Sequence, residues 1–69
     1  MDVRIRINGS DESFVPETIL DLLRRRGLDA GARGLAVAVN GAVVTRRQWE
    51  SARLSAGDEV EIVHPFTGG

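Results

Sequence analysis

The stretch Thr18-Ile19-Leu20-Asp21-Leu22-Leu23-Arg24-Arg25-Arg26-Gly27 has the pattern of one amphipathic helix with both ends marked. Three of its apolar residues recur at the i, i+3 and i+4 spacing that places side chains on one helix face. These residues are Ile19, Leu22 and Leu23. Thr18 and Asp21 resemble a capping box at the start, and Gly27 favours a stop. We therefore predict a helix from about Ile19 to Arg26 that packs one face on a sheet.

The chain before this helix has the pattern of a β-hairpin. Val3-Arg4-Ile5-Arg6-Ile7 alternates apolar and basic residues, as a strand with one buried face does. Asn8-Gly9 readily adopts the positive φ angles of a tight hairpin turn. Glu12-Ser13-Phe14-Val15 then reads as the returning strand, and Pro16 ends it because proline has no backbone N–H to donate.

The chain after the helix predicts a second pair of strands. After a glycine-punctuated loop, Leu35-Ala36-Val37-Ala38-Val39 reads as a strand with small alanines on its second face. Asn40-Gly41 predicts another tight turn, and Ala42-Val43-Val44-Thr45 a short returning strand. The segment Arg46 to Ser51 resembles a single helical or 3₁₀ turn around Trp49, whose indole we expect in the core with a partner for its N–H.

The last stretch predicts one more strand followed by a tail. Glu59-Val60-Glu61-Ile62-Val63 alternates charged and β-branched residues, and Pro65 soon after it cannot extend a central ladder. We expect a folded domain over residues 1–64 and a flexible tail over 65–69 that ends on two glycines. Val63 lies on the strand face opposite the buried residues, so Val63 and Phe66 are candidates for a docking patch.

These elements together predict an α+β fold of the β-grasp type. The order is hairpin, helix, second strand pair, short turn and terminal strand. A helical crossover after a hairpin permits a mixed sheet, which we expect to have four to five strands. One sheet with one main helix on a single face is the smallest two-layer solution for a chain of 69 residues.

The composition narrows the classes of function. A net charge of −1 argues against a general phosphate-binding surface, so we expect no nucleic-acid partner. The N-terminus lacks a basic-then-apolar signal region and no apolar run could span a membrane, which predicts a cytoplasmic protein without a membrane partner. The absence of cysteine excludes thiol chemistry and a thiolate metal site.

The basic run Arg24-Arg25-Arg26 suits the C-terminal turn of a helix, where cations interact favourably with the helix dipole and face solvent.

The side chains offer little chemistry of their own. No pair of acids is placed to act as general acid and base, and no serine has the context of a nucleophile. His64 is the single histidine, which makes a poor metal site, and we interpret it as a residue that packs at the end of the strand. We therefore expect neither an enzyme nor a metal centre. The remaining reactive group is the carboxylate of Gly69, which a partner would have to activate with ATP and its metal ion.

The motifs of the second half resemble those of a known family. The run from Val39 to Trp49, followed by Leu54 to Val63 and a final Gly68-Gly69, is similar to the ThiS family of thiamine-biosynthesis sulfur carriers. The discriminating combination is the V-N-G…V-V-x-R…W block joined to G-D-x-V-E-I-V and the two terminal glycines. The resemblance covers nearly the whole chain, with Thr18 to Leu28 as the single helix. That family has the β-grasp fold and is related to ubiquitin and to the molybdopterin-synthase subunit MoaD.

The resemblance implies a carrier function for the tail. An adenylating enzyme of the ThiF or MoeB type would activate Gly69 with ATP and magnesium, with no cofactor bound by the domain itself. A sulfur donor, such as a cysteine desulfurase, would convert the carboxylate to a thiocarboxylate, and the thiazole synthase ThiG would accept the sulfur. Gly68 and Thr67 would form the tail that reaches the active site. The residues His64 to Thr67 differ from the commonest tail of the family, and that segment would contact the acceptor enzyme.

Two other functions are compatible with the same residues. One is a carrier with the same chemistry that serves another pathway, such as molybdopterin synthesis. The other is a ubiquitin-like modifier that forms amides with protein lysines. The block around Trp49 favours the thiazole pathway.

Overall fold

The computed structural model describes residues 3–64, and the predicted tail over 65–69 lies outside the described residues. Its elements follow the order predicted for the two hairpins, the helix and the terminal strand. They are β1 (Arg4–Ile7), β2 (Ser10–Ser13), α1 (Ile19–Arg25), β3 (Ala36–Val39), β4 (Ala42–Val44), the 3₁₀ helix η1 (Arg46–Gln48) and β5 (Glu59–Val63).

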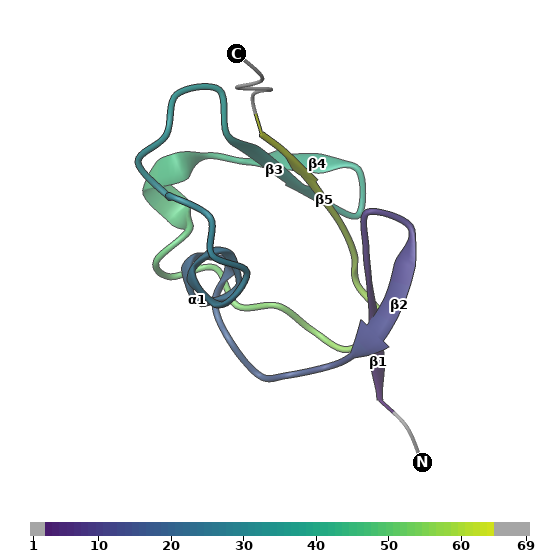
Figure 1. The fold of residues 1–69 in the computed structure, drawn as a ribbon. Coiled ribbons are helices and arrows are strands. Elements are labelled where there is room, and N and C mark those ends of the chain that lie inside the picture. Colours follow the sequence, from purple (N-terminus) through teal and green to yellow (C-terminus); the bar gives the residue numbers. More distant parts are fainter. Residues whose placement is uncertain (1–2, 65–69) are drawn as a thin grey trace.

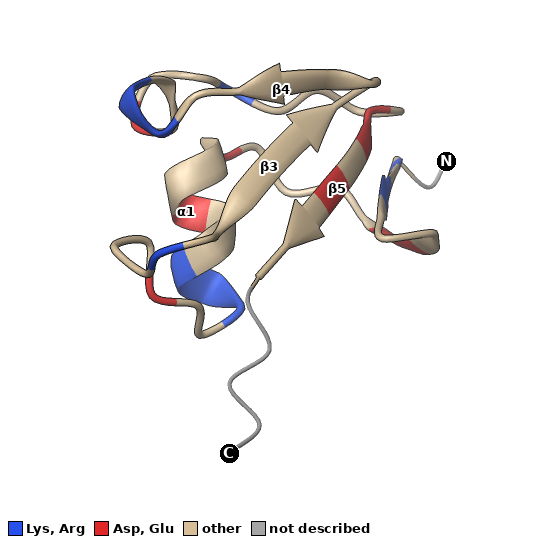
Figure 2. Cartoon of the chain, turned by 90° about the horizontal axis from the view of Figure 1, so that it is seen from above, with Lys and Arg blue, Asp and Glu red and all other residues tan. Residues whose placement is uncertain are grey.

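The five strands form one mixed sheet in the order β2-β1-β5-β3-β4. The terminal strand β5 is central, parallel to β1 and antiparallel to β3. The two hairpins β1–β2 and β3–β4 flank it on either side. Figures 1 and 2 show α1 packed across one face of this sheet. The α+β prediction and the predicted number of strands are thus confirmed.

A single core lies between α1 and the sheet. Residues from every strand except the two edge strands contribute a fully buried side chain, because alternate positions point toward the helix. The buried apolar residues are Ile5, Ile7, Ile19, Leu22, Leu23, Leu35, Val37, Trp49, Leu54, Val60 and Ile62. The three helix residues predicted to face the sheet all belong to this group.

The ends of α1 have the predicted caps. The Thr18 hydroxyl accepts a hydrogen bond from the Asp21 backbone N–H at 3.1 Å, and an Asp21 carboxylate oxygen accepts one from Thr18 N–H at 3.3 Å. At the other end Gly27 has a φ of +75°, and the N–H of Leu28 donates to the carbonyl of Leu23. This arrangement is a Schellman motif, which reverses the chain direction after Arg26.

The predicted second strand is displaced by two residues from its position in the structure. The prediction placed it at Glu12 to Val15, whereas β2 runs from Ser10 to Ser13. Asn8 and Gly9 have φ angles of +51° and +82°, so the turn contains only these two residues and pairing resumes at once. The prediction followed apolar residues, but β2 is an edge strand with mostly exposed side chains, so its position depends on the turn and not on burial.

The prediction for Trp49 is confirmed. Its side chain is 2% exposed and its indole Nε1–H donates to the carbonyl of Val44 at 3.0 Å. The guanidinium of Arg46 stacks over the ring at 4.8 Å from the centroid. The same guanidinium donates to the carbonyls of Ala30 and Ala32, so it ties the loop before β3 to η1.

Candidate functional site

The candidate site is the end of β5, where the folded domain meets the predicted tail. Val63 is the last residue of β5 and pairs with Ala36 of β3, and His64 is the last described residue. β5 pairs with β1 at Glu59 and Val60 and with β3 as far as Val63, so the chain reaches His64 from the central strand of the sheet. The predicted site residues Gly69, Gly68, Thr67 and Phe66 lie outside the described residues.

The sheet face opposite α1 carries exposed apolar side chains close to this end. Val63 is 61% exposed and Val43 of β4 is 75% exposed. On that same face the strand register places Ala36 beside Val63, and Ala38 between Val43 and the exposed Glu61. Val63 thus lies on the outward face, as predicted. We call the four residues Ala36, Ala38, Val43 and Val63 the open-face patch.

A small cavity lies on the other side of the strand end. It has a volume of about 150 Å³ and is lined by Asn8, Arg26, Leu28, Ile62 and His64. His64 itself is exposed, so the prediction that it packs at the strand end was wrong. The residues that line this cavity come together from three distant parts of the chain. No spacing in the sequence marks them as neighbours.

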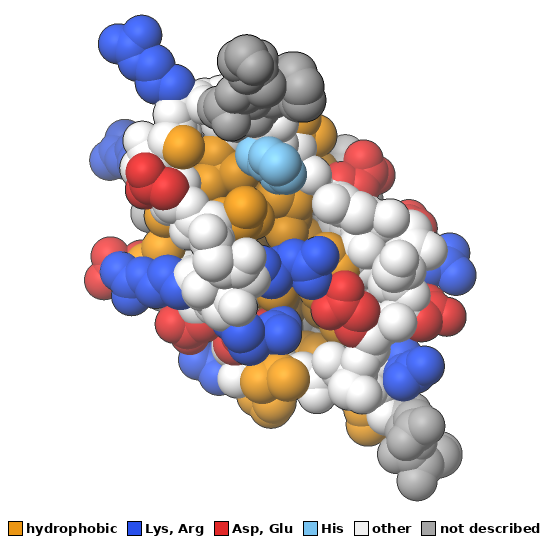
Figure 3. Space-filling view, in the orientation of Figure 1, with side chains coloured by type: hydrophobic (Ala, Val, Ile, Leu, Met, Phe, Trp, Pro, Cys, Tyr) orange, Lys and Arg blue, Asp and Glu red, His pale blue; other side chains and the backbone are white. Residues whose placement is uncertain are grey.

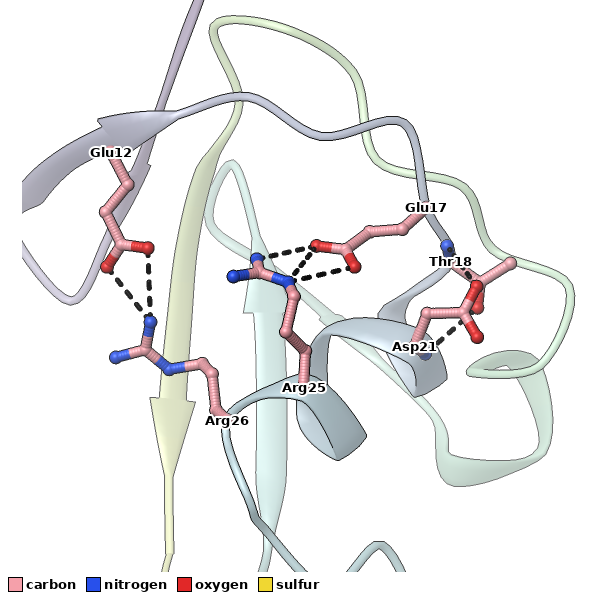
Figure 4. A network of polar contacts seen from close by, with 6 residues as sticks. All are labelled: Glu12, Glu17, Thr18, Asp21, Arg25 and Arg26. Atoms are coloured by element: carbon pink, nitrogen blue, oxygen red, sulfur yellow. Dashed lines mark hydrogen bonds and ion pairs between the residues drawn. The ribbon is translucent and has the colours of Figure 1, made fainter.

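Two ion pairs connect the end of α1 to the segments before it (Figure 4). The guanidinium of Arg25 donates to the carboxylate of Glu17 at 2.8 Å through Nη2, and that carboxylate side chain is only 9% exposed. This hydrogen bond raises the pKa of Arg25, partly against the effect of burial. Arg26 donates through Nη1 to both carboxylate oxygens of Glu12, at 3.0 and 3.2 Å. Two of the three arginines in the basic run therefore make tertiary contacts, whereas the sequence predicted a solvated run.

A second, more open cavity of about 440 Å³ lies at the opposite end of the sheet. Basic and acidic side chains alternate along it, and Arg6 pairs with Asp11 at 3.3 Å and with Glu59 at 3.9 Å. Its charges are thus largely satisfied within the domain.

Over residues 3–64, no three His, Cys, Asp or Glu side chains gather as metal ligands would, and no helix is long and apolar enough to span a membrane.

A mixed five-stranded sheet wrapped around one helix, with the last strand in the middle, defines the class of β-grasp domains. The model of the ThiS family matches residues 5–69. The chain therefore belongs to the ThiS family, as the motifs around Trp49 and Val60 indicated.

Solved structures agree with this assignment. The chain is similar to the crystal structure of thiamine biosynthesis protein ThiS from Geobacter metallireducens, with 25% sequence identity and a TM-score of 0.77. That match covers 96% of this chain and 99% of the other. An NMR solution structure of a thiamine biosynthesis protein from the same organism shows the same fold, at 23% identity and a TM-score of 0.74, over 96% of this chain and 87% of that one. No curated protein sequence matches the chain.

Proposed function

We propose that this protein is a sulfur carrier for thiazole formation in thiamine biosynthesis, and that the carboxylate of Gly69 is its functional group. The observation that carries the proposal is the match to the ThiS family, which extends through Gly68 and Gly69. The relative named as thiamine biosynthesis protein ThiS supports the choice of pathway. The carrier is a co-substrate of partner enzymes and not itself an enzyme.

The proposed chemistry occurs in successive steps at one carboxyl group. A carboxylate oxygen of Gly69 attacks the α-phosphorus of ATP, and the bond to pyrophosphate breaks to give an acyl adenylate. A sulfur nucleophile from a donor such as a cysteine desulfurase then attacks the carbonyl carbon and displaces AMP. When the nucleophile is a persulfide on the donor, the product is an acyl disulfide. A thiol reductant then attacks the donor's sulfur and breaks the S–S bond, so that the thiocarboxylate leaves and the thiol forms a disulfide with the donor. ThiG accepts the thiocarboxylate as its sulfur source. The ATP and its magnesium ion belong to a partner of the ThiF or MoeB type.

The tail residues have the properties that this chemistry requires. Gly68 and Gly69 carry no Cβ, so the chain is thin enough to pass through a narrow channel to a buried reaction centre. Thr67 and Phe66 join this tail to the strand end. The open-face patch, which includes Val63, and the tail residue Phe66 would both contact the enzyme that receives the tail. Patches of exposed apolar side chains beside a functional segment are typical of docking surfaces.

The direct test is the mass of the protein after reaction. The intact protein is incubated with ATP, a cognate adenylating enzyme and a sulfur donor, and its mass is expected to rise by the difference between one sulfur and one oxygen atom, within the C-terminal peptide. Deleting Gly69 is expected to abolish pyrophosphate release, because misplacing the reacting carbon by about 1 Å can cost on the order of a hundredfold in rate. Gly68→Ala is expected to slow pyrophosphate release without abolishing it.

The control is the thermal melting of the same variants, which is expected to be unchanged because the core of residues 3–64 is left intact. Equal thiolation of the intact and the Gly69-deleted protein would contradict the carrier function. A branched conjugate to lysine would instead identify a protein modifier. Sulfur transfer to a molybdopterin-synthase large subunit, and not to ThiG, would keep the chemistry and change the pathway.

A further inference from the structure

The cavity at the end of β5 has a lining unlike the rest of the surface. Three of its five lining residues carry N–H donors, namely Asn8, Arg26 and His64, and the other two are the apolar Leu28 and Ile62. None of the five is acidic. Figure 3 shows the imidazole beside an apolar area, with basic side chains on the far side of that area. The cavity therefore combines a donor-rich rim with an apolar wall.

Much of the donor capacity around this cavity is unused within residues 3–64. The Oδ1 of Asn8 accepts from the backbone N–H of Ile62 at 2.7 Å, which fixes the amide so that Nδ2 is its remaining polar group. Arg26 uses Nη1 for Glu12, and its Nη2 and Nε have no hydrogen-bond partner in the described part of the chain. The ring of His64 has none there either. A guanidinium has five N–H donors, so Arg26 can serve Glu12 and a second acceptor together.

These features select a particular ligand chemistry. N–H donors without an acid among them favour an anionic acceptor, and bonds from charged donors to a carboxylate are among the stronger hydrogen bonds in proteins. A volume of about 150 Å³ admits a carboxylate with one or two methylene groups and excludes a nucleotide. The methylene groups would contact Leu28 and Ile62. A free phosphate ion has no apolar part to place against this wall.

We propose that this cavity binds the carboxylate of an aspartate or glutamate side chain from the enzyme that receives the tail. His64, which lines the cavity, directly precedes residues 65–69 in sequence, so an enzyme that binds this tail acts on the chain within a few residues of the cavity. The interaction would fix the position of the domain at the root of the tail, while the open-face patch contacts the same enzyme through the sheet. The identity of the partner enzyme rests on the proposed function, whereas the choice of a carboxylate as the ligand rests on the lining of the cavity alone.

Three variants that change the net charge by the same amount test the role of the cavity. Arg26→Gln removes the guanidinium, and Asn8→Asp places a carboxylate inside the cavity in place of the Nδ2 donor. Asp tolerates the positive φ of this turn position, and its second oxygen still accepts from the Ile62 N–H. Arg24→Gln is the matched control, because Arg24 is exposed on the same helix and does not line the cavity. Each variant makes the protein more negative by one charge.

The first measurement uses propionate as the probe and NMR shifts of Asn8, Ile62 and His64 as the readout. We expect saturable shifts for the wild-type protein and for Arg24→Gln, and their loss in Arg26→Gln and Asn8→Asp. Inorganic phosphate at equal ionic strength is expected to shift these signals less than propionate. Shifts that do not saturate, or that are the same in all four proteins, would overturn the proposal, and stronger shifts with phosphate would assign the cavity to phosphate.

The second measurement is ATP-dependent pyrophosphate release with a cognate adenylating enzyme. Arg26→Gln and Asn8→Asp are expected to raise KM for the carrier by about tenfold or more with kcat unchanged, as the loss of a charge-assisted hydrogen bond does. An equal KM in all variants would refute the docking role and leave the carrier function intact. No pyrophosphate release from the wild-type protein would refute the carrier function instead, and the propionate titration would then decide the cavity alone.

Discussion

Leu23→Ala is the sharpest test of how this small domain is stabilised. Leu23 is fully buried between α1 and the sheet, and its carbonyl also accepts the capping bond from Leu28. Replacing a buried leucine by alanine costs about 2–5 kcal/mol, from lost burial and from the cavity that remains. A domain of 69 residues has a total stability of roughly 3–10 kcal/mol at the usual 0.05–0.15 kcal/mol per residue. The substitution is therefore expected to remove a large part of the free energy of unfolding.

The assay is urea denaturation, followed by the fluorescence of the single tryptophan. Leu20→Ala is the matched control, because Leu20 lies on the same helix, loses the same atoms and is only partly buried. We expect Leu20→Ala to cost about 1 kcal/mol and Leu23→Ala to lower the melting temperature by roughly 10–30 °C. A cost below about 1 kcal/mol for Leu23→Ala, or equal costs for the two variants, would refute the assignment of Leu23 to the centre of the core.

Two further predictions concern single side chains. The fluorescence of Trp49 is expected to be shifted from that of the unfolded chain and to resist quenching by acrylamide, whereas quenching as efficient as that of free tryptophan would place the indole on the surface. Trp49→Phe is expected to lower the free energy of unfolding by about 1–2 kcal/mol, because the hydrogen bond to the Val44 carbonyl is lost. Val63→Asp is expected to raise KM for the carrier in the adenylation assay by about tenfold, since it puts a charge into the open-face patch, whereas Val3→Asp, an exposed valine before β1, is expected to have no effect. Equal effects of the two aspartates would show that charge, and not the patch, determines the result.

The helices and strands of this protein are determined mainly by patterns among residues that are close together in the sequence. The spacing of Ile19, Leu22 and Leu23 defines the buried face of α1, and the capping box and Gly27 define its ends, because these signals act within one or two helical turns. The same holds for β5, whose alternation sorts Val60 and Ile62 inward and Val63 outward. The family assignment could also be predicted, since the motifs around Trp49 are contiguous.

The tertiary structure decided what contiguous patterns cannot contain. The position of β2 depends on the two positive φ angles of the Asn8-Gly9 turn, and an edge strand has no buried face to reveal its register. The use of Arg25 and Arg26 for Glu17 and Glu12 depends on how the helix end approaches two earlier segments. The cavity at the end of β5 forms only when the first turn, the helix end and the last strand meet, because hydrogen bonding and burial act between residues that are close in space and far apart in sequence.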